Sequence, residues 1–140
     1  MTREEIVKAF DRRHTFYTQL DAAGLAAGHA ENCVHESPLG GHVVGRQAMQ
    51  GFYQGLFNSF PDFSFERSQL LVDGSQVVEI GVVSGTNLGG FMGLPPTGRH
   101  FSFAFVFAST LKNGLIAKSR TIYDFTGWMV QTGVLKAKPH

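Results

Sequence analysis

His35 is the side chain of this sequence best suited to proton transfer, and it lies in a run that is expected to form a short strand, Cys33 to Ser37. Side chains alternate between the two faces of a strand, so Cys33 and Ser37 share the face of His35. An imidazole has an ordinary pKa of about 6.5 and can accept a proton near neutral pH. We therefore treat His35 as a candidate general base, with Cys33 and Ser37 as candidate substrate contacts. The alternative for His35 is a hydrogen-bonded histidine that only lines a pocket.

A second polar group lies at the end of the strand expected over residues 115–123. Ser119, Thr121 and Tyr123 share one face by the same alternation, and their hydroxyls can hydrogen-bond a carbonyl oxygen. Asp124 follows at the expected start of a helix, where a carboxylate commonly caps free backbone N–H groups. Tyr123 and Asp124 are candidate catalytic residues, and Ser119 and Thr121 are candidate substrate contacts. For Asp124 the alternative is a helix cap.

Phenylalanines recur at every second position of another expected strand, at Phe101, Phe103, Phe105 and Phe107. The four rings therefore face one side, and the side chains between them are small. If the rings face inward, they line an apolar pocket, with Phe105 and Phe107 as candidate substrate contacts, or they fill it outright. The face of small residues is flat enough to pack against a second sheet, which predicts a homodimer through the sheet.

A loop rich in glycine and proline runs from Phe91 to Arg99 between two expected strands. Its prolines donate no backbone hydrogen bond and its glycines permit unusual dihedral angles, so a shaped excursion is expected rather than a minimal turn. Phe91 and Met92 must then be buried, either at the mouth of a cavity or in a partner subunit. Two helical tyrosines, Tyr17 and Tyr53, offer their hydroxyls to the same cavity or simply pack.

The elements that position these residues follow from hydrophobic periodicity. Thr2 and Glu5 predict a capping box for a helix that runs to about Asp21, with an apolar stripe that includes His14. Helices are also predicted over 25–31, 45–60 and 124–133, and strands over 33–37, 63–72, 76–86, 99–111 and 115–123. This order predicts one α+β domain over residues 1–140. A curved antiparallel sheet packs on about three N-terminal helices and forms a cone with an internal pocket, and a short helix follows at the C-terminal end.

Composition excludes several kinds of partner and site. The formal net charge is +1, so nothing favours nucleic acid or an anionic membrane as a partner. Cys33 is the single cysteine, which excludes an internal disulfide. No signal segment opens the chain and no apolar run approaches about 20 residues, so a cytoplasmic location is expected. The six histidines lack ligand spacing, so we expect no metal and no cofactor.

Several motifs together resemble one known family. They are Gly45-Arg46-Gln47-Ala48, Phe60-Pro61-Asp62-Phe63, Gly85-Thr86, the loop from Phe91 to Arg99, Asn113-Gly114-Leu115-Ile116, Tyr123-Asp124 and Gln131-Thr132-Gly133. The chain resembles the SnoaL-like polyketide cyclases, or ester cyclases, of the nuclear-transport-factor-like α+β cone superfamily. The resemblance covers nearly the whole chain and implies the cone fold. It does not select a reaction, because the fold hosts several enzyme classes and plain binding modules.

The resemblance also indicates where this chain departs from its relatives. Cyclases of this kind carry an Asp on the last strand and a His on the strand before it, and the matching positions here are about Thr121 and Phe107. Ketosteroid isomerases carry an Asp at the position of Ser37, which places Ser37 and His35 on the inward face. Neither Thr121 nor Phe107 can act as a general base near neutral pH.

Two functions remain open. The first is a cofactor-free enzyme that performs general acid/base chemistry, an aldol-type cyclisation or isomerisation, on an apolar carbonyl compound such as a polyketide. His35 would be the base, and Tyr123, Thr121 or Ser119 would polarise the oxygen. The alternative is a non-catalytic protein of the same fold, with a binding or accessory role, that has lost the acids.

Overall fold

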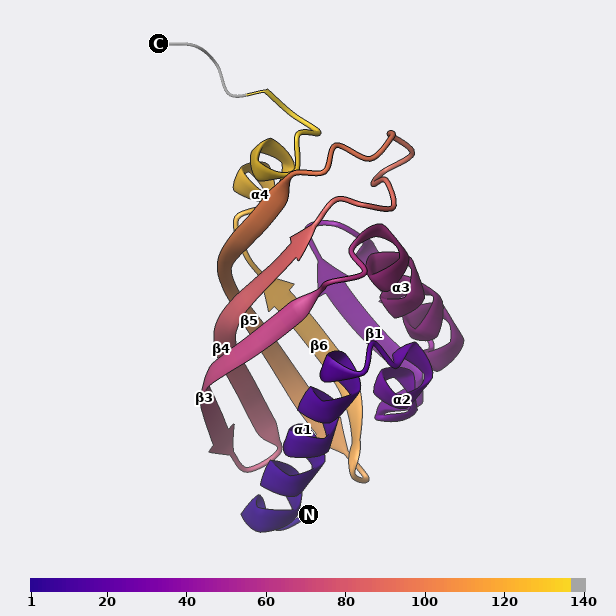
Figure 1. Cartoon of the computed structure of the whole chain (residues 1–140). Coiled ribbons are helices and arrows are strands. Elements are labelled where there is room, and N and C mark those ends of the chain that lie inside the picture. Colours follow the sequence, from indigo (N-terminus) through magenta and orange to yellow (C-terminus); the bar gives the residue numbers. More distant parts are fainter. Residues whose placement is uncertain (137–140) are drawn as a thin grey trace.

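Three helices from the first half of the chain lie against one face of a curved six-stranded sheet (Figure 1). The structure is a computed structural model that describes residues 1–136. Its elements are α1 (Arg3–Thr18), α2 (Ala22–Ala27), β1 (His29–Ser37), β2 (Gly41–Val44), α3 (Arg46–Ser59), β3 (Ser64–Asp73), β4 (Gln76–Thr86), β5 (His100–Lys112), β6 (Leu115–Ile122) and α4 (Phe125–Gln131). Within residues 1–136, no helix is long and apolar enough to cross a membrane.

The sheet has the order β2-β1-β6-β5-β4-β3 and is antiparallel except for one pair. The exception is β1, which runs parallel to β6, with His35 opposite Ser119. An antiparallel sheet was predicted, and this pair is the one parallel contact in it. The chain reaches β6 from β1 only after a long excursion through α3 and the β3–β5 meander, so the geometry of a tight hairpin does not apply.

The N-terminal half differs from the prediction at two places. The short helix lies at Ala22–Ala27 rather than over 25–31, because the Asp21 carboxylate caps it by accepting from the Gly24 N–H at 2.9 Å. β1 consequently begins at His29, four residues before the expected start. Strand β2 was not predicted: Gly41, with φ of 60°, allows the chain to turn after β1 and pair with it.

Helix α1 begins as predicted but buries a different side chain. Thr2 and Glu5 form the expected capping box, with hydrogen bonds of 3.1 and 3.0 Å. The sheet-facing stripe contains Arg13, whereas the expected His14 lies beside the stripe and is half-buried. Arg13 continues the three- and four-residue spacing that ends at Tyr17, so it is carried into the interior.

An aromatic cluster fills the end of the cone beneath α4. Phe60 packs against Phe101 and Phe91 with ring centroids 4.9 and 5.0 Å apart, and Trp128 of α4 lies 5.0 Å from Phe91. The proline-rich loop therefore buries Phe91 in the protein's own core, where its exposed fraction is 6%. Met92 does not follow it and remains 55% exposed, which corrects the expectation that both side chains are buried.

Gly81 supports the bend of the sheet and provides a test of this fold. It pairs with Arg67 next to an irregularity in the β3–β4 ladder, and a Cβ at position 81 would overlap the carbonyl oxygen of Glu66. We expect Gly81→Ala to lower the free energy of unfolding by about 1–3 kcal/mol, because backbone rather than a flexible side chain must move. Gly51→Ala is the control: a Cβ at this exposed position of α3 has no atom within 4 Å, so the variant should be as stable as the wild type or more stable. Urea denaturation measures both variants, and equal stabilities would contradict the account.

Candidate functional site

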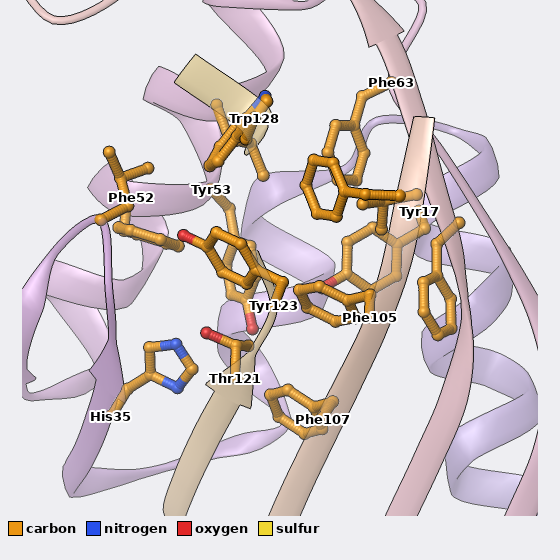
Figure 2. A pocket seen from close by; sticks show the side chains of 15 residues that line it. Tyr17, His35, Phe52, Tyr53, Phe63, Phe105, Phe107, Thr121, Tyr123 and Trp128 are labelled. Atoms are coloured by element: carbon orange, nitrogen blue, oxygen red, sulfur yellow. The ribbon is translucent and has the colours of Figure 1, made fainter. Parts of the chain in front are cut away.

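The interior of the cone contains one aromatic pocket between the sheet and the helices (Figure 2). Its lining residues come from all layers of the fold: Tyr17, His35, Leu39, Phe52, Tyr53, Leu56, Phe63, Phe65, Val83, Phe103, Phe105, Phe107, Thr121, Tyr123 and Trp128. The space in which a water molecule fits is only about 40 Å³. The inward-facing phenylalanines of β5 thus largely fill the pocket, and a ligand of several rings must displace side chains to enter.

His35 is the one histidine among the lining residues, and its surroundings keep it neutral. Its exposed fraction is 1%, its Nδ1 lies 2.7 Å from the Ser119 hydroxyl, and its ring stacks on Phe107 with centroids 6.1 Å apart. Figure 2 shows the imidazole turned toward the pocket on the side of the Thr121 hydroxyl. Burial, assisted by the charge of Arg13, lowers the pKa of His35 to about 4. At neutral pH the ring is therefore a free base.

Two hydroxyls of β6 and its end line the pocket beside His35. Thr121 is 8% exposed, and Tyr123 stacks against Phe103 and Phe105 with centroids 5.3 and 5.9 Å apart. Burial raises the pKa of Tyr123 above its ordinary value, so its phenol remains protonated and can donate. Ser119, which was predicted as a substrate contact, instead orients the His35 ring.

Several other predicted contacts lie outside the pocket. Cys33 is a buried core residue with an exposed fraction of 1%, and burial raises the pKa of its thiol. The Ser37 hydroxyl accepts a hydrogen bond from the Gly40 N–H at 2.9 Å and so stabilises the turn that leads to β2. Phe91 packs in the core, and Met92 is exposed.

Asp124 caps a helix, which was the alternative given for it. Its carboxylate accepts a hydrogen bond from the Gly127 N–H at 2.9 Å at the start of α4, and the residue is exposed. It does not line the pocket. The cap holds α4, and with it Trp128, over one end of the cavity.

A buried arginine beneath the pocket was not predicted. Arg13 of α1 donates through Nη2 to the hydroxyls of Tyr53 at 2.8 Å and Tyr17 at 3.3 Å. Its guanidinium lies 4.4 Å from the centre of the Phe107 ring, and its Nε is 3.8 Å from Glu79. Burial alone would lower the pKa of Arg13, but Tyr53, Tyr17 and Glu79 outweigh it and raise the pKa. Arg13 is therefore a permanent cation in the interior.

His29 completes this polar layer on the side of β1. It is fully buried, and its Nε2 lies 2.9 Å from the Tyr53 hydroxyl. Burial, followed by the charge of Arg13, lowers the pKa of His29 to about 2. The direction of the bond between Nε2 and the Tyr53 hydroxyl depends on the tautomer of the His29 ring, and the same hydroxyl oxygen accepts from Arg13. Arg13, Tyr53 and His29 thus form one connected hydrogen-bonded group.

The sequence from residue 8 to residue 132 matches the family model described as SnoaL-like polyketide cyclase. The chain belongs to this family. A search of curated proteins found no match to the SnoaL-like chain.

Solved structures share the fold of this SnoaL-like protein. AclR from Streptomyces galilaeus is 22% identical with a TM-score of 0.83, covering 99% of this chain and 87% of AclR. IdmH from Streptomyces antibioticus is 25% identical with a TM-score of 0.74, covering 91% and 97%. An NTF2-like protein from Burkholderia xenovorans LB400 is 23% identical with a TM-score of 0.76, covering 94% and 98%.

Two signals in the sequence could have revealed the polar layer. Arg13 lies at helical spacing from Phe10 and Tyr17, in a stripe that otherwise contains only apolar and aromatic residues. Glu79 alternates with Val77 and Val83 in β4, at a position that faces the helices. A charge in each of two inward-facing patterns indicates a buried ion pair.

Among residues 1–136, no three His, Cys, Asp or Glu side chains gather closely enough to hold a metal.

The burial of His35 predicts how the stability of this SnoaL-like protein depends on pH. The pKa of His35 is about 4 in the folded protein and about 6.5 in the unfolded chain. Between these pH values the unfolded chain binds a proton that the folded protein does not, so the free energy of unfolding falls as the pH is lowered through this window. We expect His35→Gln to remove roughly 3 kcal/mol of the loss between pH 7 and pH 4. The measurement is urea unfolding at both pH values. His42→Gln, at an exposed site, should keep the wild-type dependence, and identical behaviour of the two variants would refute the explanation.

Proposed function

We propose that this protein is a cofactor-free enzyme that moves protons on an apolar, carbonyl-bearing small molecule such as a polyketide. The observation that carries the proposal is a neutral, oriented imidazole, that of His35, in an aromatic pocket. Family membership supports cyclisation as the reaction, as does the likeness to IdmH, itself a proposed polyketide cyclase. We further propose a cytoplasmic location, as the sequence predicted.

The chemistry follows from which atoms remain free. When Nδ1–H of His35 donates to the Ser119 hydroxyl, Nε2 holds the lone pair that faces the ligand. Nε2 takes a proton from the carbon next to the carbonyl, the C–H electron pair forms the C=C bond of an enolate, and the carbonyl π pair moves onto the oxygen, to which a hydroxyl of Thr121 or Tyr123 donates. The enolate carbon then attacks a second carbonyl carbon, whose oxygen takes the proton back from His35, or a conjugated enolate regains that proton at another carbon. The first outcome is aldol-type cyclisation, and the second is isomerisation.

A non-catalytic binding protein is the second candidate, and specific observations favour it. Ser37, Phe107 and Thr121 stand where related enzymes were expected to carry acids or a histidine, and none of these side chains is a base near neutral pH. Asp124, the carboxylate nearest to Thr121 in the sequence, caps α4. The two candidates differ in whether His35 is needed for turnover or only for the shape of the pocket.

Substitution of His35 separates the two candidates. A panel of polycyclic β-keto esters, steroid enones and epoxides is incubated with the wild type, His35→Ala and His42→Ala. Thermal shift reports binding, and mass spectrometry reports turnover. We expect His35→Ala to retain binding and to lose turnover by about 100-fold or more, because the proton acceptor is removed. His42→Ala, at an exposed site, should retain both. If compounds stabilise the wild type but none of them is turned over, the result would favour the binding protein.

The outer face of the sheet supports a homodimer as part of the proposal. Ile80, Val106 and Ile122 stand side by side across β4, β5 and β6 on the face away from the helices. Ile122 is 54% exposed and neighbouring Val82 is 43% exposed. Such a row of apolar side chains on the outer face of the sheet fits a second copy of itself.

A single charge in this surface tests the dimer. Ile122→Arg places a guanidinium in the centre of the proposed interface, where it would be desolvated without a partner. We expect the wild type to elute with twice the chain mass in size-exclusion chromatography with light scattering, and the variant with the mass of one chain. Leu88→Arg introduces the same charge at a 54% exposed site outside the sheet and should remain dimeric. A monomeric wild type at micromolar concentration would end the proposal.

A further inference from the structure

The cavity inside the cone is too small for a ligand of several rings, so part of its wall must move when such a ligand enters. Its free space of about 40 Å³ admits only a few water molecules. The sheet cannot provide the opening, because its six strands form one hydrogen-bonded series from β2 to β3. The opening must therefore lie among the segments that close the cone: the first three helices, α4 with the loop before β5, and the β1–β2 turn.

The helical wall is tied to the sheet by buried hydrogen bonds. Arg13 of α1 donates to the hydroxyl of Tyr53 in α3 at 2.8 Å, and that hydroxyl lies 2.9 Å from Nε2 of His29 in β1. All three residues are buried, so a broken bond here would leave a polar group without a partner in the interior. This group links α1, α3 and β1, and it makes the helical wall costly to open.

The wall formed by α4 is tied in a similar way. The fully buried side chain of Asn87 donates to the Thr97 hydroxyl at 3.2 Å and to the Thr132 carbonyl at 3.4 Å, and so joins the loop before β5 to the end of α4. Phe91 of the loop and Trp128 of α4 pack with ring centroids 5.0 Å apart. Opening this wall would expose two large rings and break the bonds of a buried amide.

The β1–β2 turn around Leu39 is tied to the protein more weakly. Leu39 lines the pocket and is half-buried, whereas the residues on either side of it are exposed. The turn leads to β2, an edge strand with a neighbour on one side only. The bond from the Gly40 N–H to the Ser37 hydroxyl lies within the turn, and the Leu39 backbone is hydrogen-bonded to the Tyr123 hydroxyl. Because Gly40 and Gly41 change their dihedral angles at little cost, the turn can swing outward while β1 and β2 stay paired.

An open groove lies directly outside this turn. It provides about 300 Å³ of space for water between Pro38 of the turn and the exposed pair of Glu36 and Arg120, which are 3.0 Å apart. Thr121 borders both the groove and the pocket, so the two spaces are neighbours. Figure 2 shows the Thr121 hydroxyl on the side of the His35 ring. A ligand that passes Leu39 from the groove therefore arrives beside His35.

We propose that ligands enter the pocket from this groove and that Leu39 is the gate residue. Its side chain closes the pocket when the turn is folded inward and admits a ligand when the turn swings outward. The opening of the turn then determines how fast ligands enter and leave. This inference rests on the proposed function only in placing a ligand in the pocket, and it holds for an enzyme and for a binding protein alike.

Stopped-flow fluorescence of the full-length protein with N-phenyl-1-naphthylamine, an uncharged aromatic probe that brightens in apolar surroundings, measures both rates. Trp128 lines the pocket and is the single tryptophan of the chain, so energy transfer from Trp128 to the probe reports entry into this cavity. We expect Leu39→Ala to raise the association and dissociation rate constants together by about fivefold or more, because the smaller side chain leaves the way open. Leu39→Trp should lower both rate constants.

Leu56→Ala is the matched control, because Leu56 is also a half-buried leucine of the pocket wall but belongs to α3. It removes a similar apolar contact with the probe, so we expect faster dissociation and an unchanged association rate constant. Asn87→Ala loosens the α4 wall and should not accelerate association. Thermal unfolding establishes that each variant is folded. If Leu39→Ala is not folded, Leu39→Trp decides, and wild-type rates in that variant would overturn the gate.

The other outcomes separate the gate from the proposed function. Association that is accelerated by Asn87→Ala but not by Leu39→Ala would place the entrance at α4 and overturn the gate. Equal changes in Leu39→Ala and Leu56→Ala would also overturn it, because Leu39 would then be an ordinary contact. So would a wild type that does not bind the probe, while turnover of the compound panel would still decide the proposed function. Faster rates in Leu39→Ala without turnover of the panel would support the gate and contradict the enzyme.

Discussion

The inward face of the curved sheet must be covered by apolar side chains for the helices to pack on it, and aromatic rings provide this cover. Phe101, Phe103, Phe105 and Phe107 project from one strand toward the helices, and Phe60, Trp128 and Tyr123 pack against this row. Aromatic rings bury large areas with few rotatable bonds, so a small number of them covers a curved surface. The same rings determine how little space a ligand finds, since the core and the pocket are one continuous cluster.

The polar layer beneath this cluster has a different character. Arg13, Tyr53 and His29 are linked by directional hydrogen bonds at a depth where water cannot compensate a lost partner. A buried ion pair seldom adds stability over an apolar substitute, so Arg13 and Glu79 are costly as purely structural residues. Arg13 bonds the two phenols that line the pocket, and Glu79 pairs with Arg13 and Arg67.

Local patterns predicted much of this molecule, and long-range geometry accounts for most of the corrections. The resemblance at Ser37 together with alternation predicted His35 on the inward face, where it lines the pocket, and the capping box at Thr2 is present. The parallel partner of β1 could not be read from its sequence, because the pairing depends on a strand about 80 residues later. Arg13 was missed because the neighbouring His14 fits the helical period almost as well. At Asp124 the sequence left two roles open, and only the position of the Gly127 N–H distinguishes them.

The parallel contact between β1 and β6 has a consequence for biosynthesis. The strands of the meander β3–β4–β5 can pair as soon as they leave the ribosome, since each strand pairs with its neighbour in the chain. β1 pairs only with β2 until Leu115–Ile122 has been made, so the ring of His35 meets Ser119 only after the meander has been synthesised. The nascent chain must therefore carry three helices and a strand with one unpaired edge until β6 has been made, and the wall of the pocket that holds His35 assembles after the meander.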